Sequence, residues 1–192
     1  MLHSIMRLSL AAALSVGVGS AVAAPVTYEL DGSHSFAAFS YPHIGLSTQQ
    51  QRFNGTKGTI VLDTEAKTGS VDVIVDTTTI STGHAGFDKH IQGPDFLDTA
   101  AHPTATFKSS KVVFEGDKPV AVEGDLTIKG VTKPVTLKLS SFASKEHPMA
   151  KKPAIGANAT TVIKRSDFNA SKFVPAVGDD VTLQLVVEAL AP

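Results

Sequence analysis

The sequence predicts an all-β protein whose antiparallel sheet of about eight strands closes into a barrel, with one short helix near its mouth. About nine runs alternate apolar and polar residues with period two, as half-buried strands do. Short clusters of turn residues separate these runs, and short links favour antiparallel neighbours. A single segment has helical spacing instead, so no helical layer can cover the sheet.

The predicted strands are rich in Val, Thr, Ile and Phe, which fit a pleated, half-buried surface. In the fourth run, Val71, Val73 and Val75 face one way, whereas Asp72 and Asp76 face the other. One face of the sheet is therefore apolar and the other is exposed to water. In chain order, the predicted strands span residues 26–31, 34–45, 58–63, 70–80, 104–114, 120–128, 134–142, 157–165 and 181–189.

One segment between the fourth and fifth runs, STGHAGFDKHIQGPDFLD, loses the period-two pattern. Phe87, His90 and Ile91 lie at positions i, i+3 and i+4, which predicts a helix over about residues 84–92. Thr82 is the expected N-cap, and the Gly-Pro pair that follows should end the helix. A single short helix can cover one mouth of a barrel, but not a sheet face.

Residues 124–139, GDLTIKGVTKPVTLKL, predict a β-hairpin. Gly130 can adopt the positive φ of a tight turn, and Pro134, which has no N–H, fits the first residue of a strand. The apolar face of this hairpin carries Leu126, Ile128, Val135, Leu137 and Leu139.

The apolar face of the sheet must be covered by the sheet itself, either in a barrel or in a sandwich. The chain has no cysteine for an inter-sheet disulfide, and the meander-like strand order favours the barrel. An eight-stranded barrel can be filled by side chains or can hold one small ligand. The many Val, Thr, Ala and Gly residues favour a lumen, and a filled core is the alternative.

Residues 1–23 are typical of a secretory signal peptide, with Arg7 before an apolar stretch and a small-x-small triplet at the end. The apolar stretch is shorter than the roughly 20 residues that span a bilayer. We expect cleavage after Ala23 and a single exported domain over residues 24–192. The formal net charge of −1, without basic runs, gives no reason to expect nucleic acid as a partner.

Histidine and carboxylate side chains on the predicted helix suggest a metal site, but their spacing argues against it. His84 and Asp88 would share a helix face, whereas His90 would point away. No cysteine and no HExxH motif supplies further ligands, so no metal site is predicted. The sequence also lacks a GxSxG motif and a phosphate loop, so a hydrolase is the less favoured alternative to a binding protein.

Several ordered motifs resemble the YceI-like family of periplasmic proteins over nearly all of the mature chain. Besides the hairpin, they are His34-Ser35-Phe36, Asp88-x-His90 leading to Asp95-Phe96-Leu97, His102-Pro103-x-x-x-Phe107 and Arg165-Ser166-Asp167-Phe168. The resemblance implies an extended lipocalin-like barrel in the periplasm, without catalysis or a cofactor. Its apolar lumen would bind a polyisoprenoid lipid, either an isoprenoid quinone or a polyprenyl phosphate.

On this resemblance, the inward strand positions should contact the lipid tail, and two helical residues should form a lid. The nominated residues are Phe39, Tyr41, Ile60, Leu62, Val73, Val75, Phe107, Leu126, Ile128, Val135, Leu137 and Ile163 on strands, with Phe87 and Ile91 in the lid.

Two polar residues near the mouth have alternative roles. His43 either binds the head group or forms a polar corner, and Arg165 pairs either with an anionic head or with Asp167 and a loop. Transient membrane contact and a monomer or homodimer are expected. The alternative function is a stress-responsive structural or interaction module with a filled barrel.

Overall fold

The computed structural model describes residues 24–192, so the predicted signal peptide lies outside the described residues. The described chain forms nine strands, one α-helix and one 3-10 helix. They are β1 (Val26–Leu30), β2 (Phe36–His43), β3 (Ser47–Asp63), β4 (Thr68–Ser81), α1 (Ala85–Gln92), β5 (Thr104–Glu115), β6 (Lys118–Ile128), β7 (Val131–Glu146), β8 (Pro153–Lys164), η1 (Arg165–Phe168) and β9 (Asp180–Leu190).

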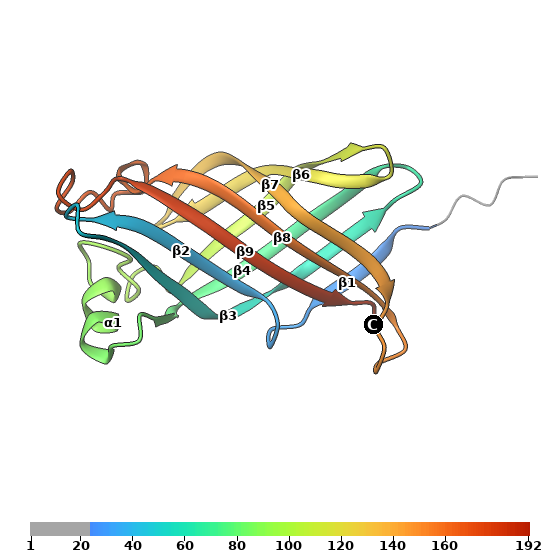
Figure 1. The fold of residues 1–192 in the computed structure, drawn as a ribbon, viewed down its shortest axis with the longest axis horizontal. Helices are drawn as coiled ribbons and strands as arrows, with labels where there is room; N and C mark the ends of the chain where they lie inside the picture. The colour runs from blue at the N-terminus through green and yellow to red at the C-terminus, as the bar shows by residue number, and fades with distance from the viewer. Residues whose placement is uncertain (1–23) are drawn as a thin grey trace, which may run out of the picture.

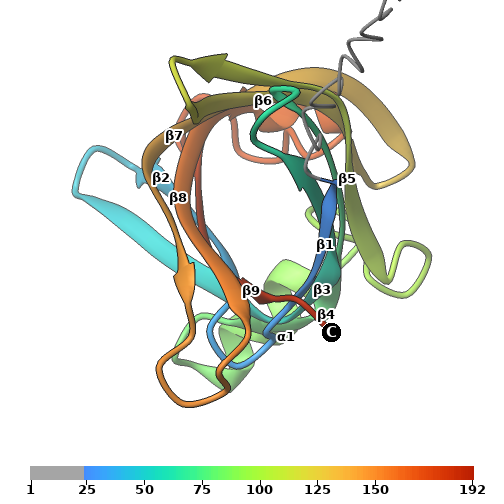
Figure 2. The ribbon, with the colours of Figure 1, turned by 90° about the vertical axis from the view of Figure 1, so that its right-hand side faces the viewer.

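The strands form one closed antiparallel sheet, and Figure 2 shows them arranged in a ring. β1 and β2 occupy the same place in this ring. β1 pairs with β3 and β9 towards one end, and β2 pairs with the same two strands towards the other. β3 also pairs with β4, which completes the ring. The barrel therefore has eight strand positions, which confirms the predicted fold class.

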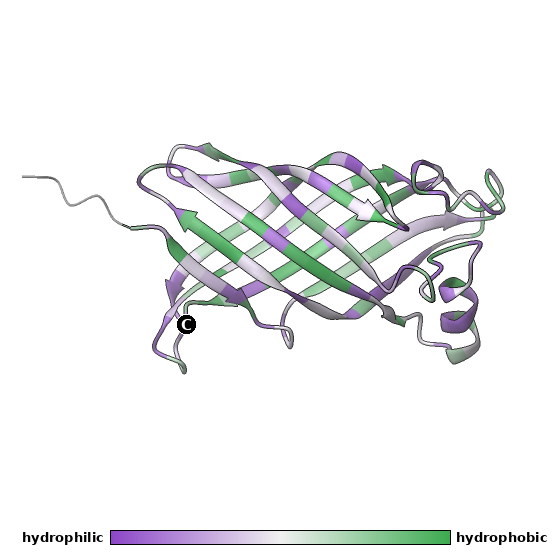
Figure 3. Ribbon diagram, turned by 180° about the vertical axis from the view of Figure 1, so that it is seen from behind, coloured by the Kyte–Doolittle hydropathy of each residue, from purple (hydrophilic) through white to green (hydrophobic). Residues whose placement is uncertain are grey.

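The two ends of the barrel differ, as Figure 1 shows. One end, called the α1 end below, carries the β2–β3 turn, α1, the β6–β7 turn and residues 165–179. The opposite end carries the short β3–β4 and β5–β6 turns and the β7–β8 loop over residues 147–152. Hydropathy alternates along the strands (Figure 3), and the buried apolar residues gather on the inner side of the sheet.

β3 is much longer than predicted, because the sequence pattern identified only its last part, residues 58–63. Its first part, STQQQR, contains no apolar residue, so a strand prediction based on apolar alternation fails there. The segment is nevertheless fully paired with β2, from His43–Ser47 to Ala37–Phe53. A register shift between Phe53 and Gly55 marks where β3 leaves β2.

The predicted helix is present, but its cap is not Thr82. The helix begins at Ala85, so His84 is the N-cap, and its ring nitrogen accepts from the Phe87 N–H at 3.3 Å. Thr82 lies two residues too early, and its backbone N–H instead donates to Asp88 at 2.7 Å. Hydrogen bonds from Thr82 lower the pKa of the Asp88 carboxyl.

Hydrogen bonds hold the loop between β1 and β2 against β9, at the point where the ring position passes from one strand to the other. Fully buried Ser35 donates to the Glu188 carbonyl at 2.9 Å and accepts from the Glu188 N–H at 3.1 Å. In the same loop, His34 Nδ1 lies 2.7 Å from Asp31 Oδ2. Hydrogen bonds from Ser33 and His34 lower the pKa of Asp31 to about 2, and Asp31 raises the pKa of His34.

We expect His34 to titrate above its ordinary value of 6.5 and to return towards it in Asp31→Asn. A raised histidine pKa stabilises the fold below 6.5, and this contribution is lost as the pH rises through the folded value. The lowered carboxyl pKa stabilises above 3.8, and this contribution is lost as the pH falls towards 2. NMR titration of the imidazole measures the shift, and a value at or below 6.5 in the unchanged protein would contradict it.

Candidate ligand-binding site

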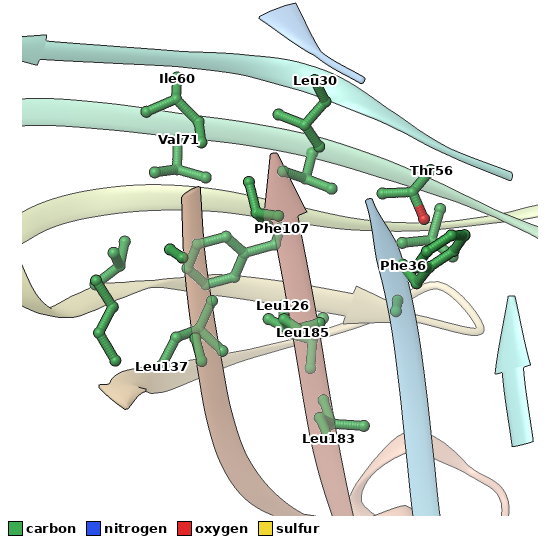
Figure 4. Close-up of a pocket in the computed structure, with 18 of the residues that line it drawn as sticks. Leu30, Phe36, Thr56, Ile60, Val71, Phe107, Leu126, Leu137, Leu183 and Leu185 are labelled. Atoms are coloured by element: carbon green, nitrogen blue, oxygen red, sulfur yellow. The ribbon is translucent and has the colours of Figure 1, made fainter. Parts of the chain in front are cut away.

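The barrel encloses a first cavity of about 180 Å³, which is almost entirely apolar (Figure 4). Every strand contributes to its wall, from Leu30 of β1 to Leu185 of β9. Among the residues that line it, Thr56 and Thr106 carry the only polar side chains, and none carries a charge. Apolar cavities of this kind stay dry and take up apolar molecules.

A second cavity of about 230 Å³ lies at the α1 end and combines apolar walls with polar groups. α1 supplies Phe87 and Ile91, and η1 supplies Phe168, whose side chain is almost fully buried. The following loop supplies apolar side chains such as Phe173. The polar or charged side chains that line this cavity are Tyr41, His43, Thr77, His90 and Arg165.

The two cavities are neighbours inside the barrel, because several residues line both, and we call these shared residues the waist. Ala105 is the smallest of them, and it lies opposite Val75 of the neighbouring strand. The residues shared by the two cavities are Phe39, Phe53, Ala105, Ile128 and Leu183. The barrel interior thus holds an apolar chamber on one side of the waist and a chamber with polar groups on the other.

Arg165 holds the loop that follows η1 against the second cavity. Its Nε donates to the Gly178 carbonyl at 2.8 Å and its Nη2 to the Val177 carbonyl at 2.9 Å. Its Nη1 donates to the Ala170 carbonyl. Burial lowers the pKa of the guanidinium. Of the two alternatives predicted for Arg165, the structure shows the structural one, with three backbone carbonyls as partners.

The structure does not pair Arg165 with Asp167, whose side chain is exposed. The carboxylate whose charge raises the pKa of Arg165 is that of Asp179. Asp179 itself accepts from the Ser166 N–H at 2.9 Å and from the Ser166 hydroxyl at 2.8 Å, which fixes the start of η1.

Tyr41 and Gln51 form a buried polar spot next to Arg165. Burial raises the pKa of the Tyr41 hydroxyl, so the hydroxyl stays protonated and can donate a hydrogen bond, whereas the interactions with Gln51 and Arg165 act in the opposite direction. Gln51 is buried too, and its Oε1 has no hydrogen-bond partner in the described part of the chain. An orphaned buried acceptor costs free energy unless a ligand or water satisfies it.

His43 closes the end of β2 and lines the second cavity. Its backbone forms a bridge with Val177, so β2 is joined to the loop that Arg165 holds. The position of His43 fits both predicted roles, because the residue lies at a polar corner and also lines the cavity.

His43 and the fourteen nominated residues make fifteen candidate ligand-binding residues, of which fourteen line one or both cavities. Val135 does not, although it packs against the hydrophobic core. Lipid contact by these residues stays a prediction. Residues in the first cavity are Phe39, Ile60, Leu62, Val73, Val75, Phe107, Leu126, Ile128 and Leu137. Those in the second are Phe39, Tyr41, His43, Phe87, Ile91, Ile128 and Ile163.

Several lining residues are not among the nominated ones. Leu183 and Leu185 line the first cavity, and their alternation with Thr182 and Gln184, which predicts the strand 181–189, places them on one face of β9. Phe53 follows the polar start of β3, where there is no apolar alternation to indicate it.

The three residues of metal-ligating type on and beside α1 make other contacts in the structure. His84 caps α1, Asp88 accepts from Thr82, and the His90 ring lies 4.7 Å from that of Phe96. Among residues 24–192, no group of three His, Cys, Asp or Glu side chains is placed to hold a metal ion. In the same range, no helix has the length and apolar character needed to cross a bilayer.

Comparison with known proteins gives consistent matches. The YceI-like domain matches residues 28–189. Protein YceI of Escherichia coli O157:H7 is 38% identical over 180 residues, which cover 93% of both chains. The crystal structure of Burkholderia cenocepacia BcnA has a TM-score of 0.71 at 22% identity and covers 85% of this chain and 99% of that one. A polyisoprenoid binding domain from Saccharophagus degradans has a TM-score of 0.66 at 18% identity, with coverage of 87% and 99%.

Proposed function

Because the chain belongs to the YceI-like family, we propose that it is a periplasmic carrier that shields an isoprenoid lipid inside its barrel. The lipid tail would lie in the first cavity and pass the waist, and the head group would lie in the second cavity. The chain would be exported by its first 23 residues and cleaved after Ala23. No catalytic step is part of this proposal.

The observation that carries the proposal is the pair of neighbouring cavities in the barrel, which share the waist residues. Their volumes are about 180 and 230 Å³. Both are lined mostly by apolar side chains, so an apolar occupant that withdraws this surface from water would stabilise the folded barrel. A solved structural relative described as a polyisoprenoid binding domain supports an isoprenoid as that occupant.

The placement of polar groups supports a head group at the α1 end. The first cavity has no charged lining residue, whereas Tyr41 and Arg165 line the second. In the described chain, Arg165 is the single Lys or Arg that lines it, and its donors already serve three carbonyls. One such cation is poor compensation for a buried phosphate, so we favour an uncharged acceptor such as a quinone carbonyl.

The cavities also bear on the rival functions. A structural module with a filled barrel would have side chains in place of this space. A hydrolase would need a nucleophile beside a base, and neither cavity is lined by Ser, Asp or Glu, in the part of the chain that the structure describes. Ligand binding is therefore the function that the geometry supports best.

Solvent extraction of the purified protein tests the proposal directly. We expect mass spectrometry of the extract to show an isoprenoid lipid in near-stoichiometric amount. Delipidated protein should then take up ubiquinone-10 in preference to undecaprenyl phosphate. If the extract holds no isoprenoid and delipidated protein takes up neither probe, the proposed function is wrong.

We expect Ala105→Trp to block the waist and to lower quinone uptake at least tenfold, because an indole would stand where both cavities meet. Thr104→Trp is the matched control, since Thr104 is the exposed neighbour on the same strand. Uptake is measured at equilibrium after dilution of the quinone from ethanol, and circular dichroism verifies that both variants fold. Equal uptake by the two variants would contradict a tail that passes the waist.

A further inference from the structure

Large apolar side chains are exposed at the α1 end of the barrel. Ile44 is 51% exposed and Leu46 is 82% exposed, both in the β2–β3 turn. Phe173, in the loop held by Arg165, is 53% exposed. Of the remaining exposed large apolar residues in the described chain, Met149 lies in the loop at the opposite end, and Val162 and Val186 lie on strands.

Two of these side chains occupy backbone positions that suit other residue types. Ile44 and Gly45 are the central residues of the turn closed by the Leu46 N–H to His43 carbonyl bond, and both have positive φ, 46° and 72°. Such a turn favours Asn-Gly, and a β-branched residue is strained there. Phe173 also has a positive φ, of 66°. About half of each side chain is nevertheless exposed, so burial only partly offsets the unfavourable backbone positions.

The turn and the loop form one tip, which is continuous with the second cavity. The Ile44 N–H donates to the Ala176 carbonyl at 2.9 Å, and the Val177 N–H donates to the Phe173 carbonyl at 2.8 Å. Phe173 also lines the second cavity, so its ring belongs to both the tip and the cavity wall. In Figure 1 the turn and the loop lie together at the left end of the barrel.

We infer that Ile44, Leu46 and Phe173 insert into the surface of a phospholipid bilayer, so that the α1 end docks where an isoprenoid lipid enters or leaves the barrel. This inference rests on the proposed function, because it takes the ligand to be a membrane lipid. Three exposed apolar side chains at a cavity mouth suit a bilayer, in which apolar surface is withdrawn from water without a matching protein partner.

Apolar contact rather than charge should drive this docking. Two basic side chains of the α1 end have partners within the protein: Lys172 lies 3.6 Å from Asp95 and 5.5 Å from the centre of the Phe173 ring, and Lys129 donates to the carbonyls of Pro94 and Asn169. We expect binding to vesicles of phosphatidylethanolamine, with or without phosphatidylglycerol, to be weak, reversible and insensitive to salt.

The test combines Ile44→Asn, Leu46→Ser and Phe173→Asn in one variant and measures co-sedimentation with such vesicles. We expect the vesicle-bound fraction to fall roughly tenfold or more, because the inserted apolar area is removed. Ubiquinone-10 transfer from vesicles should slow by a similar factor. Asn suits the positive φ at positions 44 and 173, which should offset the lost contact between the Phe173 and Phe96 rings. The melting temperature of the variant should therefore stay close to that of the unchanged protein, which separates docking from folding.

Met149→Ser, at the opposite end and 84% exposed in the unchanged protein, is the matched control and should leave both measurements unchanged. Ubiquinone-10 uptake from ethanol needs no docking, so it should survive in the double variant Ile44→Asn/Leu46→Ser, whose changed residues line neither cavity. If the unchanged protein takes up no ubiquinone-10 from ethanol, the proposed function is wrong. Vesicle binding is measured without quinone, so it tests the docking separately. The inference is overturned by any of three results: the triple variant co-sediments with vesicles as the unchanged protein does, the unchanged protein does not bind vesicles, or 0.5 M salt releases the bound protein from them.

Discussion

Replacement of Arg165 by Met should lower the free energy of unfolding by about 3 kcal/mol, or roughly 6–12 °C in Tm for a domain of this size. The guanidinium donates to the carbonyls of Ala170, Val177 and Gly178, and Met keeps the apolar stem but removes every donor. Partly buried carbonyls would then lose charge-assisted hydrogen bonds, which are stronger than neutral ones.

The same change should also weaken quinone uptake, because the loop that carries Phe173 and Val177 walls the second cavity. Arg165→Lys is the matched control: it keeps the charge but cannot reach three separate carbonyls, so it should lose less stability than Met. Urea denaturation and equilibrium uptake of ubiquinone-10 measure the two effects. A Met variant as stable as the Lys variant would show that the three hydrogen bonds do not hold the loop.

Most of the barrel could be predicted from period-two alternation, because one face of each strand is withdrawn from water. The prediction failed where the strand has no apolar face. Residues 47–52 are polar, yet they form the start of β3, since pairing with β2 satisfies their backbone groups. Alternation also cannot show that β1 and β2 share one place in the ring, which depends on pairing across the whole chain.

The cavity residues could be predicted for the same reason, since inward strand positions of a barrel face its lumen. The presence of an open lumen could not be predicted, because the same apolar strand faces would also build a filled core. The difference depends on small side chains such as Ala105 and Ala159, which leave space where larger ones would close it. The partners of Arg165 could not be predicted either, because they are backbone carbonyls, which no residue type identifies.

One added methyl group should cause a large loss of stability at Gly124, in the first strand of the predicted hairpin. A Cβ there would lie 2.5 Å from the Lys108 carbonyl oxygen, 2.7 Å from Ser109 Cα and 2.7 Å from Phe107 Cζ. Two of these atoms belong to the backbone of the paired strand β5, so they cannot move away without breaking the pairing. We expect Gly124→Ala to lower the free energy of unfolding by about 3 kcal/mol.

Gly156→Ala is the matched control, because Gly156 also lies inside a strand but its Cβ would meet only the Val187 carbonyl oxygen, at 3.7 Å. That change should be neutral or stabilising by up to about 1 kcal/mol, since alanine restricts the unfolded chain. Thermal and urea denaturation measure both variants. In Gly124→Ala, adding Phe107→Leu should restore only part of the loss, because it relieves the ring contact and leaves both backbone contacts. If Gly124→Ala matches Gly156→Ala in stability, then β5 and β6 do not approach each other as closely as the barrel requires.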